Sequence, residues 1–403
     1  MDQISKKIKM ISQRLKKLKN KFYDYGIDGY IVPKNDVYFS EFAKKDKLKT
    51  ITGFTGSFGL AIILKNKNFL FVDGRYVEQA KIQAGKIFNI LEIPQKLPYQ
   101  ILSSNLNLGF DPMVFTSRSL LYFFRSKIKL TPITTAILSS NILKDHKPKK
   151  FYLLKPEVVG ETTNSKIKKL IQILRKDGSD HIFISAPENV AWLLNIRGRD
   201  NPFSPIPYCR IILNTKGEVS FFSDIKSSSN ILKKKDFIKT SFFDENQIES
   251  FLNKLNAKKI IIDKNSCSVF FENLINSKFK ISNIGDPLYL MKSVKNKVEI
   301  NNTIKSHIHD GVAVTKFLYW IKKNQKKNVS EIDAEKKLES FRKQNKNYLF
   351  PSFSTISATG KNGSIIHYRA SEKTCRKIKQ NDIYLCDSGG QYNYGTTDIT
   401  RTI

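Results

Sequence analysis

The feature that most constrains the fold is an internal repeat in the first two-thirds of the chain. In each copy a helical stretch is followed by Gly-x-Asp, an apolar strand, and then proline beside a polar residue. One spacing of 152 residues relates three pairs of landmarks: Gly26 and Gly178, Asp28 and Asp180, Asp111 and Asp263. Because a spacing held over distant landmarks is hard to obtain by chance, the sequence predicts two copies of one α/β domain.

The length of 403 residues accommodates two to three domains. We place the boundaries near the Lys/Pro-rich stretch at 144–150 and near Gly285–Pro287. The predicted domains are therefore 1–150, its repeat 151–289, and a third region 290–403. Each repeat should be a mixed sheet covered by helices, which gives an α/β class for the first two domains.

The third region changes pattern, from long helices to short strands. Lys295–Lys323 has apolar residues at helical spacing, and Ser330–Asp333 has the form of a capping box that opens a second helix. The predicted apolar face of the first helix is formed by Val298, Ile304, Ile308, Val312, Phe317, Trp320 and Ile321. From Phe350 onwards four segments, including SIIHYRA around His367, are expected to be strands, so this region is α+β.

The net charge of +33 invites a nucleic-acid interpretation, but the distribution of the basic residues argues against it. The chain has 57 lysines and only 12 arginines, and the lysines are spread along its whole length. Nucleic-acid readers favour the bidentate fork of arginine. The densest runs, Lys144–Lys150 and Lys233–Lys235, are short. We therefore expect solvated lysine faces and no nucleic-acid partner.

The sequence also predicts no membrane partner and a reducing compartment. No stretch approaches 18 consecutive apolar residues. The N-terminal segment repeats apolar residues from Ile4 to Phe22 at helical spacing, which favours a helix packed on its domain over a membrane anchor. The four cysteines form no CxxC pair, which is typical of a cytoplasmic protein with free thiols.

The strongest local signal for chemistry is a pair of aspartates near the end of the chain. Asp387 follows the apolar strand Ile383–Cys386, and Asp398 lies in a Thr/Ile-rich strand beyond a hairpin. In a hairpin symmetric about residues 392 and 393, the two carboxylates face each other and repel unless a cation lies between them. The alternative is that both aspartates only cap turns and strand ends. His367, 20 residues upstream of Asp387, is placed at a strand end.

A series of motifs along nearly the whole chain resembles the Xaa-Pro aminopeptidases, members of the creatinase/prolidase metallopeptidases with a pita-bread catalytic domain. The motifs are Thr52–Gly59 (TGFTGSFG), Val72–Tyr76 (VDGRY), Trp192–Asp200 (WLLNIRGRD), Lys295–Glu299 (KNKVE), His307–Gly311 (HIHDG) and Ser352–Arg401. The resemblance implies two creatinase N-terminal-like domains before the catalytic domain. It implies metal-dependent hydrolysis of the peptide bond that precedes a proline in second position.

The resemblance also implies roles for single residues. Asp387 is expected to chelate one of two Mn²⁺ ions and Asp398 to bridge both, with Zn²⁺ or Co²⁺ as alternative metals. His367 is expected to contact the substrate and to help move a proton. Arg75 is expected to contact the peptide, although a salt-bridged structural role is equally open. Family members are commonly dimers.

The family's metal site uses two Asp, one His and two Glu, and only five residues follow Asp398. We therefore expect that the sequence is a C-terminally truncated member whose residues 1–403 alone bind metal weakly and hydrolyse little. Two other functions stay open. One is a non-catalytic scaffold or binding relative, and the other is a different pita-bread hydrolase such as a prolidase or creatinase.

Overall fold

A computed structural model describes residues 3–43, 46–134, 137–138, 149–232, 239–324 and 327–403. The chain forms two compact units, and each is built from more than one stretch of sequence. Unit 1 comprises residues 1–149, 168–190 and 208–287, and unit 2 comprises 150–167, 191–207 and 288–403.

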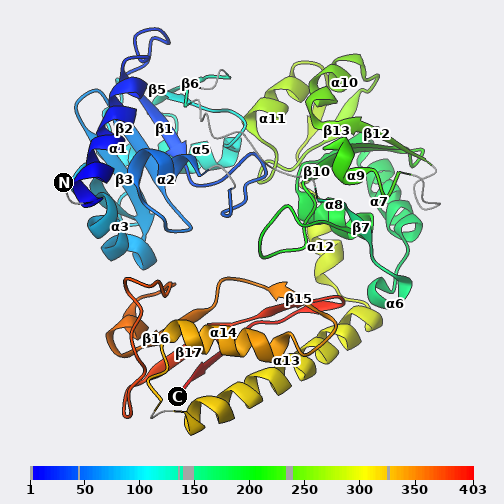
Figure 1. The fold of residues 1–403 in the computed structure, drawn as a ribbon. Helices are drawn as coiled ribbons and strands as arrows, with labels where there is room; N and C mark the ends of the chain where they lie inside the picture. The colour runs from blue at the N-terminus through cyan, green and yellow to red at the C-terminus, as the bar shows by residue number, and fades with distance from the viewer. Residues whose placement is uncertain (1–2, 44–45, 135–136, 139–148, 233–238, 325–326) are drawn as a thin grey trace. The chain divides into compact units, whose positions relative to one another are not determined.

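Unit 1 contains two six-stranded sheets of the same topology (Figure 1). The first has the order β4-β3-β2-β1-β5-β6, with β1 (Gly29–Pro33), β2 (Leu60–Leu64), β3 (Asn68–Asp73), β4 (Asn89–Ile93), β5 (Asn107–Phe110) and β6 (Lys129–Pro132). The second has the order β12-β11-β10-β8-β13-β14, with β8 (His181–Ile184), β10 (Cys209–Asn214), β11 (Val219–Ser223), β12 (Thr240–Asp244), β13 (Lys259–Ile261) and β14 (Lys280–Ser282). In both sheets the three strands that come first in the sequence (β1, β2 and β3 in one, β8, β10 and β11 in the other) pair antiparallel with one another. All the other strand pairings are parallel. The predicted duplication is confirmed.

The repeated aspartates accept equivalent backbone hydrogen bonds in both copies. Asp28 accepts a hydrogen bond from the backbone N–H of Asn107 at 2.9 Å, which joins the start of β1 to the start of β5. Asp180 accepts from the backbone N–H of Lys259 at 2.9 Å, which joins β8 to β13 in the same way. The glycines two residues before these aspartates both have positive φ, +58° and +67°. These landmarks recur because the same turn must be built twice.

Helices cover the sheets of both copies. Those of the first are α1 (Gln3–Lys19), α2 (Lys47–Thr52), α3 (Val77–Ala84), α4 (Pro98–Ile101) and α5 (Ser117–Phe124). Those around the second are α7 (Thr163–Asp177), α8 (Pro187–Leu193), α9 (Ile225–Ser228), α10 (Ile248–Lys254) and α11 (Val269–Asn276). The N-terminal helix packs on its own domain as predicted, because Ile11, Leu15 and Leu18 are buried in the core of the first copy.

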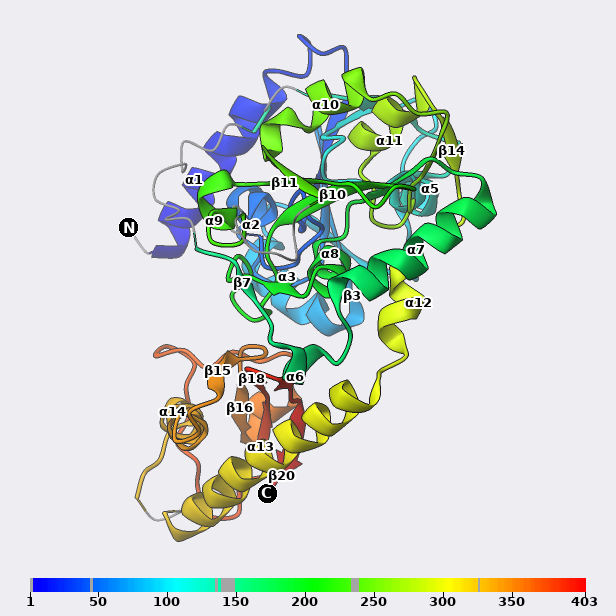
Figure 2. The same cartoon turned by 90° about the vertical axis from the view of Figure 1, so that its right-hand side faces the viewer.

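Unit 2 packs two helices, α13 (Lys297–Lys323) and α14 (Glu331–Arg342), against short antiparallel strands (Figures 1 and 2). One sheet has the order β16-β17-β20 and another β15-β18-β19, with β15 (Tyr348–Pro351), β16 (Ile356–Thr359), β17 (Tyr384–Ser388), β18 (Gly390–Tyr392), β19 (Gly395–Thr396) and β20 (Ile399–Thr402). The unit also holds α6 (Pro156–Val159), β7 (Tyr152–Leu153), β9 (Ile196–Arg197) and α12 (Leu288–Ser293). The capping box is confirmed: Ser330 caps α14 and Asp333 bonds back to it.

The predicted apolar face of α13 is right for Phe317 and Ile321, which are buried, but wrong for three of its seven residues. Ile304, Ile308 and Val312 are 55%, 62% and 52% exposed. The buried face instead comprises Ser306, Asp310, Ala313, Val314, Phe317 and Ile321. Two polar residues replace apolar ones on this face. Asp310 accepts hydrogen bonds from Arg342 of α14 and Tyr392 of β18, and Ser306 donates to the carbonyl of Asn302 in its own helix, so hydrophobicity alone does not identify this side.

The predicted strand around His367 is also wrong. Residues Gly360–Ser364 form the 3₁₀ turn η4, and His367 follows in a loop with φ of +56°. Ile365 and Ile366, which suggested a buried strand, are 47% and 55% exposed. The loop is held by polar contacts described below, which a hydrophobic pattern does not reveal. The lysine run 144–148 and Lys233–Lys235 lie outside the described residues.

Candidate functional site

The hairpin that carries the two candidate aspartates is shifted by two residues from its predicted register. Tyr392 pairs with Gly395, so the turn is centred on Asn393 and Tyr394. Asp387 consequently pairs with Thr400 and not with Asp398. In this register Asp398 occupies a diagonal position relative to Asp387, a spacing that still brings polar side chains within reach.

The electrostatics of the pair agree with this proximity. Asp398, an exposed residue at the entry to β20, has a pKa raised from its ordinary value, first by partial desolvation and then by the negative charge of Asp387. Asp387 is half-buried and accepts a hydrogen bond of 2.8 Å from the Thr400 hydroxyl. Two carboxylates whose charges oppose each other form a locus that a cation would stabilise.

The chemistry of these donors fits a hard or borderline divalent cation, because carboxylate oxygens are its preferred ligands. Asp387 and Asp398 would hold it. The described residues contain no cluster of three or more His, Cys, Asp or Glu side chains placed to bind a metal ion. Among them the aspartate pair is therefore a partial ligand set, not a complete coordination sphere.

Gly389 fixes the backbone between the two aspartates. A Cβ at this position would lie 2.0 Å from the carbonyl oxygen of Thr397 and 2.1 Å from the hydroxyl of Ser352. The Ser352 hydroxyl donates to that same carbonyl at 2.8 Å, and its backbone N–H donates to the carbonyl of Gly389 at 3.1 Å. The backbone at Gly389 lies so close to Thr397 and Ser352 that only glycine fits. This close contact constrains the backbone between Asp387 and Asp398.

A buried ion pair supports the same strand from its other face. Arg342 and Asp310 have side chains only 2% exposed, and the Arg342 guanidinium donates to Asp310 at 2.6 and 3.0 Å. Arg342 also donates to the Ser388 hydroxyl at 3.0 Å, and the Tyr392 hydroxyl donates to Asp310 at 2.9 Å. Because side chains alternate along β17, Ser388 reaches the helices while Asp387 projects to the opposite face.

Sequence reasoning missed this network, although one signal was available. Asp310 stands in the middle of a long helix, where a buried acidic residue is unfavourable without a partner. Burial opposes the charge of Arg342, but its hydrogen bonds to Asp310 and that residue's charge outweigh the effect and hold the Arg342 pKa above its ordinary value.

The His367 loop packs on the side of the sheet that carries Asp387. Tyr368, next to His367, is buried in a cluster with Ile356 and Leu385. Ile356 is the β16 partner of Asp387, and Leu385 precedes Asp387 by one strand repeat. The structure thus brings three predicted residues, His367, Asp387 and Asp398, into one unit and the first two onto neighbouring segments.

Arg75 lies in the other unit, directly after β3. Its guanidinium forms a two-pronged pair with Asp73, with N···O distances of 3.0 and 2.7 Å, and its side chain is 43% exposed. The hydrogen bond to Asp73 raises the pKa of Arg75. The salt-bridged role is therefore present in the structure, while the predicted contact with peptide stays a prediction.

The remaining motif residues form caps and packing contacts. Asn296 of KNKVE caps α13 and Glu299 bonds back to it, and Glu299 also accepts from the Trp192 indole at 3.2 Å. Lys166 is fully buried and donates to Asn195 of WLLNIRGRD at 2.8 Å. His307 of HIHDG faces the carbonyl of Thr303 in its own helix at 2.9 Å.

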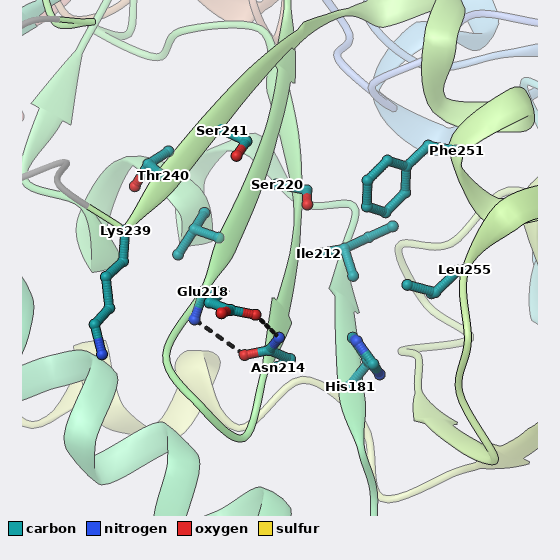
Figure 3. A pocket seen from close by; sticks show the side chains of 11 residues that line it. His181, Ile212, Asn214, Glu218, Ser220, Lys239, Thr240, Ser241, Phe251 and Leu255 are labelled. Carbon is teal, nitrogen blue, oxygen red and sulfur yellow. Dashed lines mark hydrogen bonds between the residues drawn. The ribbon is translucent and has the colours of Figure 1, made fainter.

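A cavity of about 480 Å³ lies in unit 1, between α10 and strands β8, β10, β11 and β12 of the second sheet (Figure 3). His181, Ser220, Thr240 and Phe251 are among the residues that line it, as are Asn214 and Glu218, which are hydrogen-bonded to each other. None of the four predicted site residues lines this cavity.

Comparison with known families defines the class of protein. Residues 14–139 and 144–299 each match a model of the creatinase/prolidase N-terminal domain, and residues 302–403 match metallopeptidase family M24. The two sheets of unit 1 thus lie in regions that match creatinase-type N-terminal domains, and the aspartate hairpin of unit 2 lies in the region that matches the metallopeptidase family.

The relatives narrow this class to one family. The chain is 33% identical over 94% of its length to Xaa-Pro aminopeptidase ApepP of Drosophila melanogaster. It is 32% identical over 97% of its length to a probable Xaa-Pro aminopeptidase P of Coccidioides posadasii. The chain belongs to the Xaa-Pro aminopeptidase family, as the motifs predicted. It spans 65% of the Drosophila protein and 69% of the fungal one.

A solved structure supports the fold. The X-prolyl aminopeptidase of Caenorhabditis elegans, described as a cytosolic enzyme with a di-nuclear active site, superposes with a TM-score of 0.88 at 23% identity. The match covers 98% of this chain and 70% of that one. The predicted fold class, two creatinase N-terminal-like domains followed by pita-bread catalytic elements, is confirmed.

Proposed function

We propose that this chain acts in the metal-dependent hydrolysis of the peptide bond between an N-terminal residue and a following proline. Family membership supports the reaction class. The observation that carries the proposal is the aspartate pair: Asp387 pairs with Thr400, which places Asp398 diagonally across the hairpin from it. Two neighbouring carboxylates repel each other, and a cation bound between them removes this repulsion.

In this proposal Asp387 and Asp398 hold the metal. A bound divalent ion would supply Lewis-acid polarisation of the scissile carbonyl and a nucleophile at neutral pH. Mn²⁺, as two ions, is the metal we propose, with Zn²⁺ and Co²⁺ as alternatives. Thr400 orients Asp387 through its hydroxyl, and Gly389 sets the separation of the two carboxylates.

His367 is the proposed catalytic residue that contacts the peptide and moves a proton at the scissile bond. An imidazole titrates near neutral pH and can both donate and accept a proton. Its place in an exposed loop, beside residues that pack on the Asp387 face of the sheet, supports this role. Arg75 is proposed as a second contact with the peptide.

Several further features are part of the proposal. The substrate is a peptide with proline at the second position, and we propose neither nucleic acid nor membrane as a partner. None of the helices in the described part of the chain combines the length and apolar character needed to span a bilayer. We further propose a cytoplasmic location, a homodimer, and the domain division 1–150, 151–289 and 290–403.

Metal binding tests the proposal first. Titration of Mn²⁺ into the metal-free chain, followed by calorimetry, should show binding that Asp387→Asn and Asp398→Asn each weaken by at least about tenfold, because each substitution removes one anionic ligand. Glu339→Gln, at a half-buried acidic position on α14 away from the aspartate pair, is the matched control and should leave the affinity unchanged. If the native chain, both aspartate variants and the Glu339 variant bind Mn²⁺ with equal affinity, Asp387 and Asp398 are not metal ligands. That result would favour the scaffold alternative.

Peptide hydrolysis tests the reaction and separates the related hydrolases. Cleavage should require proline at position two, fail with an alanine peptide of the same length, and disappear in Asp398→Asn. Preference for dipeptides over longer peptides would favour prolidase instead. The expectation that residues 1–403 alone are nearly inactive finds no support in the comparisons, and the same assay decides it.

A further inference from the structure

Glu331 is a fully buried carboxylate at the first position of α14. Its side chain is 0% exposed, and within the described residues no ion pair accompanies it. A buried carboxylate without a counter-charge is strongly unfavourable unless several donors satisfy it. The arrangement around Glu331 therefore needs a physical explanation.

All of the donors that satisfy this carboxylate come from one segment of chain. They are the backbone N–H of Thr359 at 2.7 Å, the Asn362 amide at 3.0 and 3.1 Å, the Tyr368 hydroxyl at 2.9 Å and the backbone N–H of Arg376 at 3.0 Å. The backbone of Glu331 adds two more contacts, since its N–H donates to the Arg376 carbonyl and its carbonyl accepts from Ser357. One side chain thus fixes both ends and the middle of the segment 359–376.

This segment is the loop that carries His367. Tyr368 packs in a small apolar cluster, but the loop's isoleucines at 365 and 366 are exposed and do not anchor it. His367 itself has φ of +56°, a conformation that costs energy for a residue with a side chain. Asn362 and Tyr368, which both bond to Glu331, flank His367 in sequence. The strained backbone at His367 is therefore maintained from both sides by a single buried carboxylate.

We propose that Glu331 is a positioning residue that sets the conformation of the loop 360–376 and hence the orientation of His367. What His367 does rests on the proposed function, but the positioning does not. Glu331 touches no candidate metal ligand, and its effect passes through Asn362, Tyr368 and the Arg376 backbone. The Glu331 side chain connects α14, a rigid helix, to the loop and so holds the loop in one conformation.

Glu331→Gln tests the proposal with little change in shape. The glutamine places an NH₂ donor where a carboxylate oxygen now accepts, so it faces the Asn362 amide, the Tyr368 hydroxyl or the Arg376 N–H with a donor. Because buried donors left without acceptors are costly, the loop should loosen. Hydrogen exchange at residues 360–376 should accelerate by about tenfold or more. Glu339→Gln, at a half-buried position of the same helix where the carboxylate pairs with Lys343, is the matched control.

Histidine NMR supplies a readout that a purely stabilising role would not change. The chain has five histidines, so a ¹³C-histidine spectrum is simple, and His367→Asn assigns the relevant signal. Glu331→Gln should shift the His367 ring signal and its titration midpoint while the signals of His181, His307 and His309 stay in place. Tyr368→Phe, which removes one of the donors, should shift the His367 signal in the same direction by a smaller amount.

The outcomes are distinguishable. If the Glu331→Gln protein is folded with unchanged His367 signal and unchanged loop exchange, the positioning role is wrong, even if its melting temperature falls. If that variant does not fold, the Tyr368→Phe result decides in the same way. Neither readout involves peptide hydrolysis. If the proposed peptidase activity is not found, the positioning role of Glu331 can still be correct. If the positioning role is wrong, the proposed peptidase activity is not thereby contradicted.

Discussion

Asp310→Ala removes one partner of the buried ion pair that lies beneath the strand carrying Asp387. In the native protein both charged side chains are 2% exposed, and the guanidinium donates twice to Asp310. The substitution leaves the Arg342 guanidinium with only the Ser388 hydroxyl, and it also deprives the Tyr392 hydroxyl of its acceptor. An uncompensated charge and an unsatisfied hydroxyl then remain inside the unit.

The magnitude follows from these contacts. Breaking a buried pair by deleting one partner costs about 3–5 kcal/mol, because the remaining charge stays out of water. Nearly complete burial places this pair toward the upper part of that range. Replacing both partners with apolar residues, Asp310→Leu with Arg342→Met, should recover most of the loss, since it removes both charges together.

Tryptophan fluorescence measures the unfolding of unit 2, which contains Asp310 and Arg342. The only two tryptophans, Trp192 and Trp320, both belong to the unit that contains the ion pair. Urea unfolding followed by their emission therefore reports on this unit, where a single transition of the whole multidomain chain would be hard to interpret. The Asp310→Ala midpoint should fall, with the free energy of unfolding reduced by about 3–5 kcal/mol.

An ion pair at the end of α14 supplies the control. The side chains of Glu339 and Lys343 are 33% and 64% exposed, so their pair is far more accessible to water than Asp310 and Arg342, and Glu339→Ala should cost no more than about 1 kcal/mol. A loss of similar size for Asp310→Ala and Glu339→Ala would refute the reasoning. So would a double replacement at Asp310 and Arg342 that is no more stable than the single one.

Two further predictions concern the hairpin and the repeat. Gly389→Ala should destabilise the same unit by at least about 1–3 kcal/mol, because its Cβ would overlap the Thr397 carbonyl, whereas Gly311→Ala, with open space in α13, should stabilise by about 0.5–1 kcal/mol; the same urea assay compares them. Asp180→Ala should cost about 1–3 kcal/mol at pH 7. Backbone N–H donors lower the Asp180 pKa, so its stabilisation is present above an unfolded pKa of about 3.9 and is lost as pH falls through the folded value. Circular dichroism across pH should therefore show the two proteins converging in acid, and a constant difference down to pH 2 would contradict the assignment.

The repeat was predictable because local chemistry dictates it. The Asp28 and Asp180 carboxylates each satisfy backbone groups at the start of a neighbouring strand, and this need recurs wherever the same turn is built. Gly-x-Asp before an apolar run is therefore a signal that can be read without knowing the rest of the fold. The capping box at Ser330 was predictable for the same reason.

Features that depend on distant contacts were not predictable in this way. The strand pairing of Asp387 with Thr400 depends on a turn at Asn393 and Tyr394 and on the close passage at Gly389. The buried face of α13 depends on Arg342 from another helix, which makes Asp310 an interior residue. The assumption of a hairpin symmetric about residues 392 and 393 gave the wrong pairing for Asp387. Hydrophobic periodicity misplaced part of the α13 face, because it weighs each side chain without its partners.

The sequence by itself determined the duplicated α/β architecture and the family, since these depend on local turns and on motifs that are contiguous in the chain. The tertiary structure alone decided how the aspartate pair is spaced, which charges are buried beneath it, and how the His367 loop is held. Those properties belong to contacts between residues far apart in sequence, such as Glu331 with Tyr368 and Asp310 with Arg342. A buried charge is tolerated only where folding brings its partner to it.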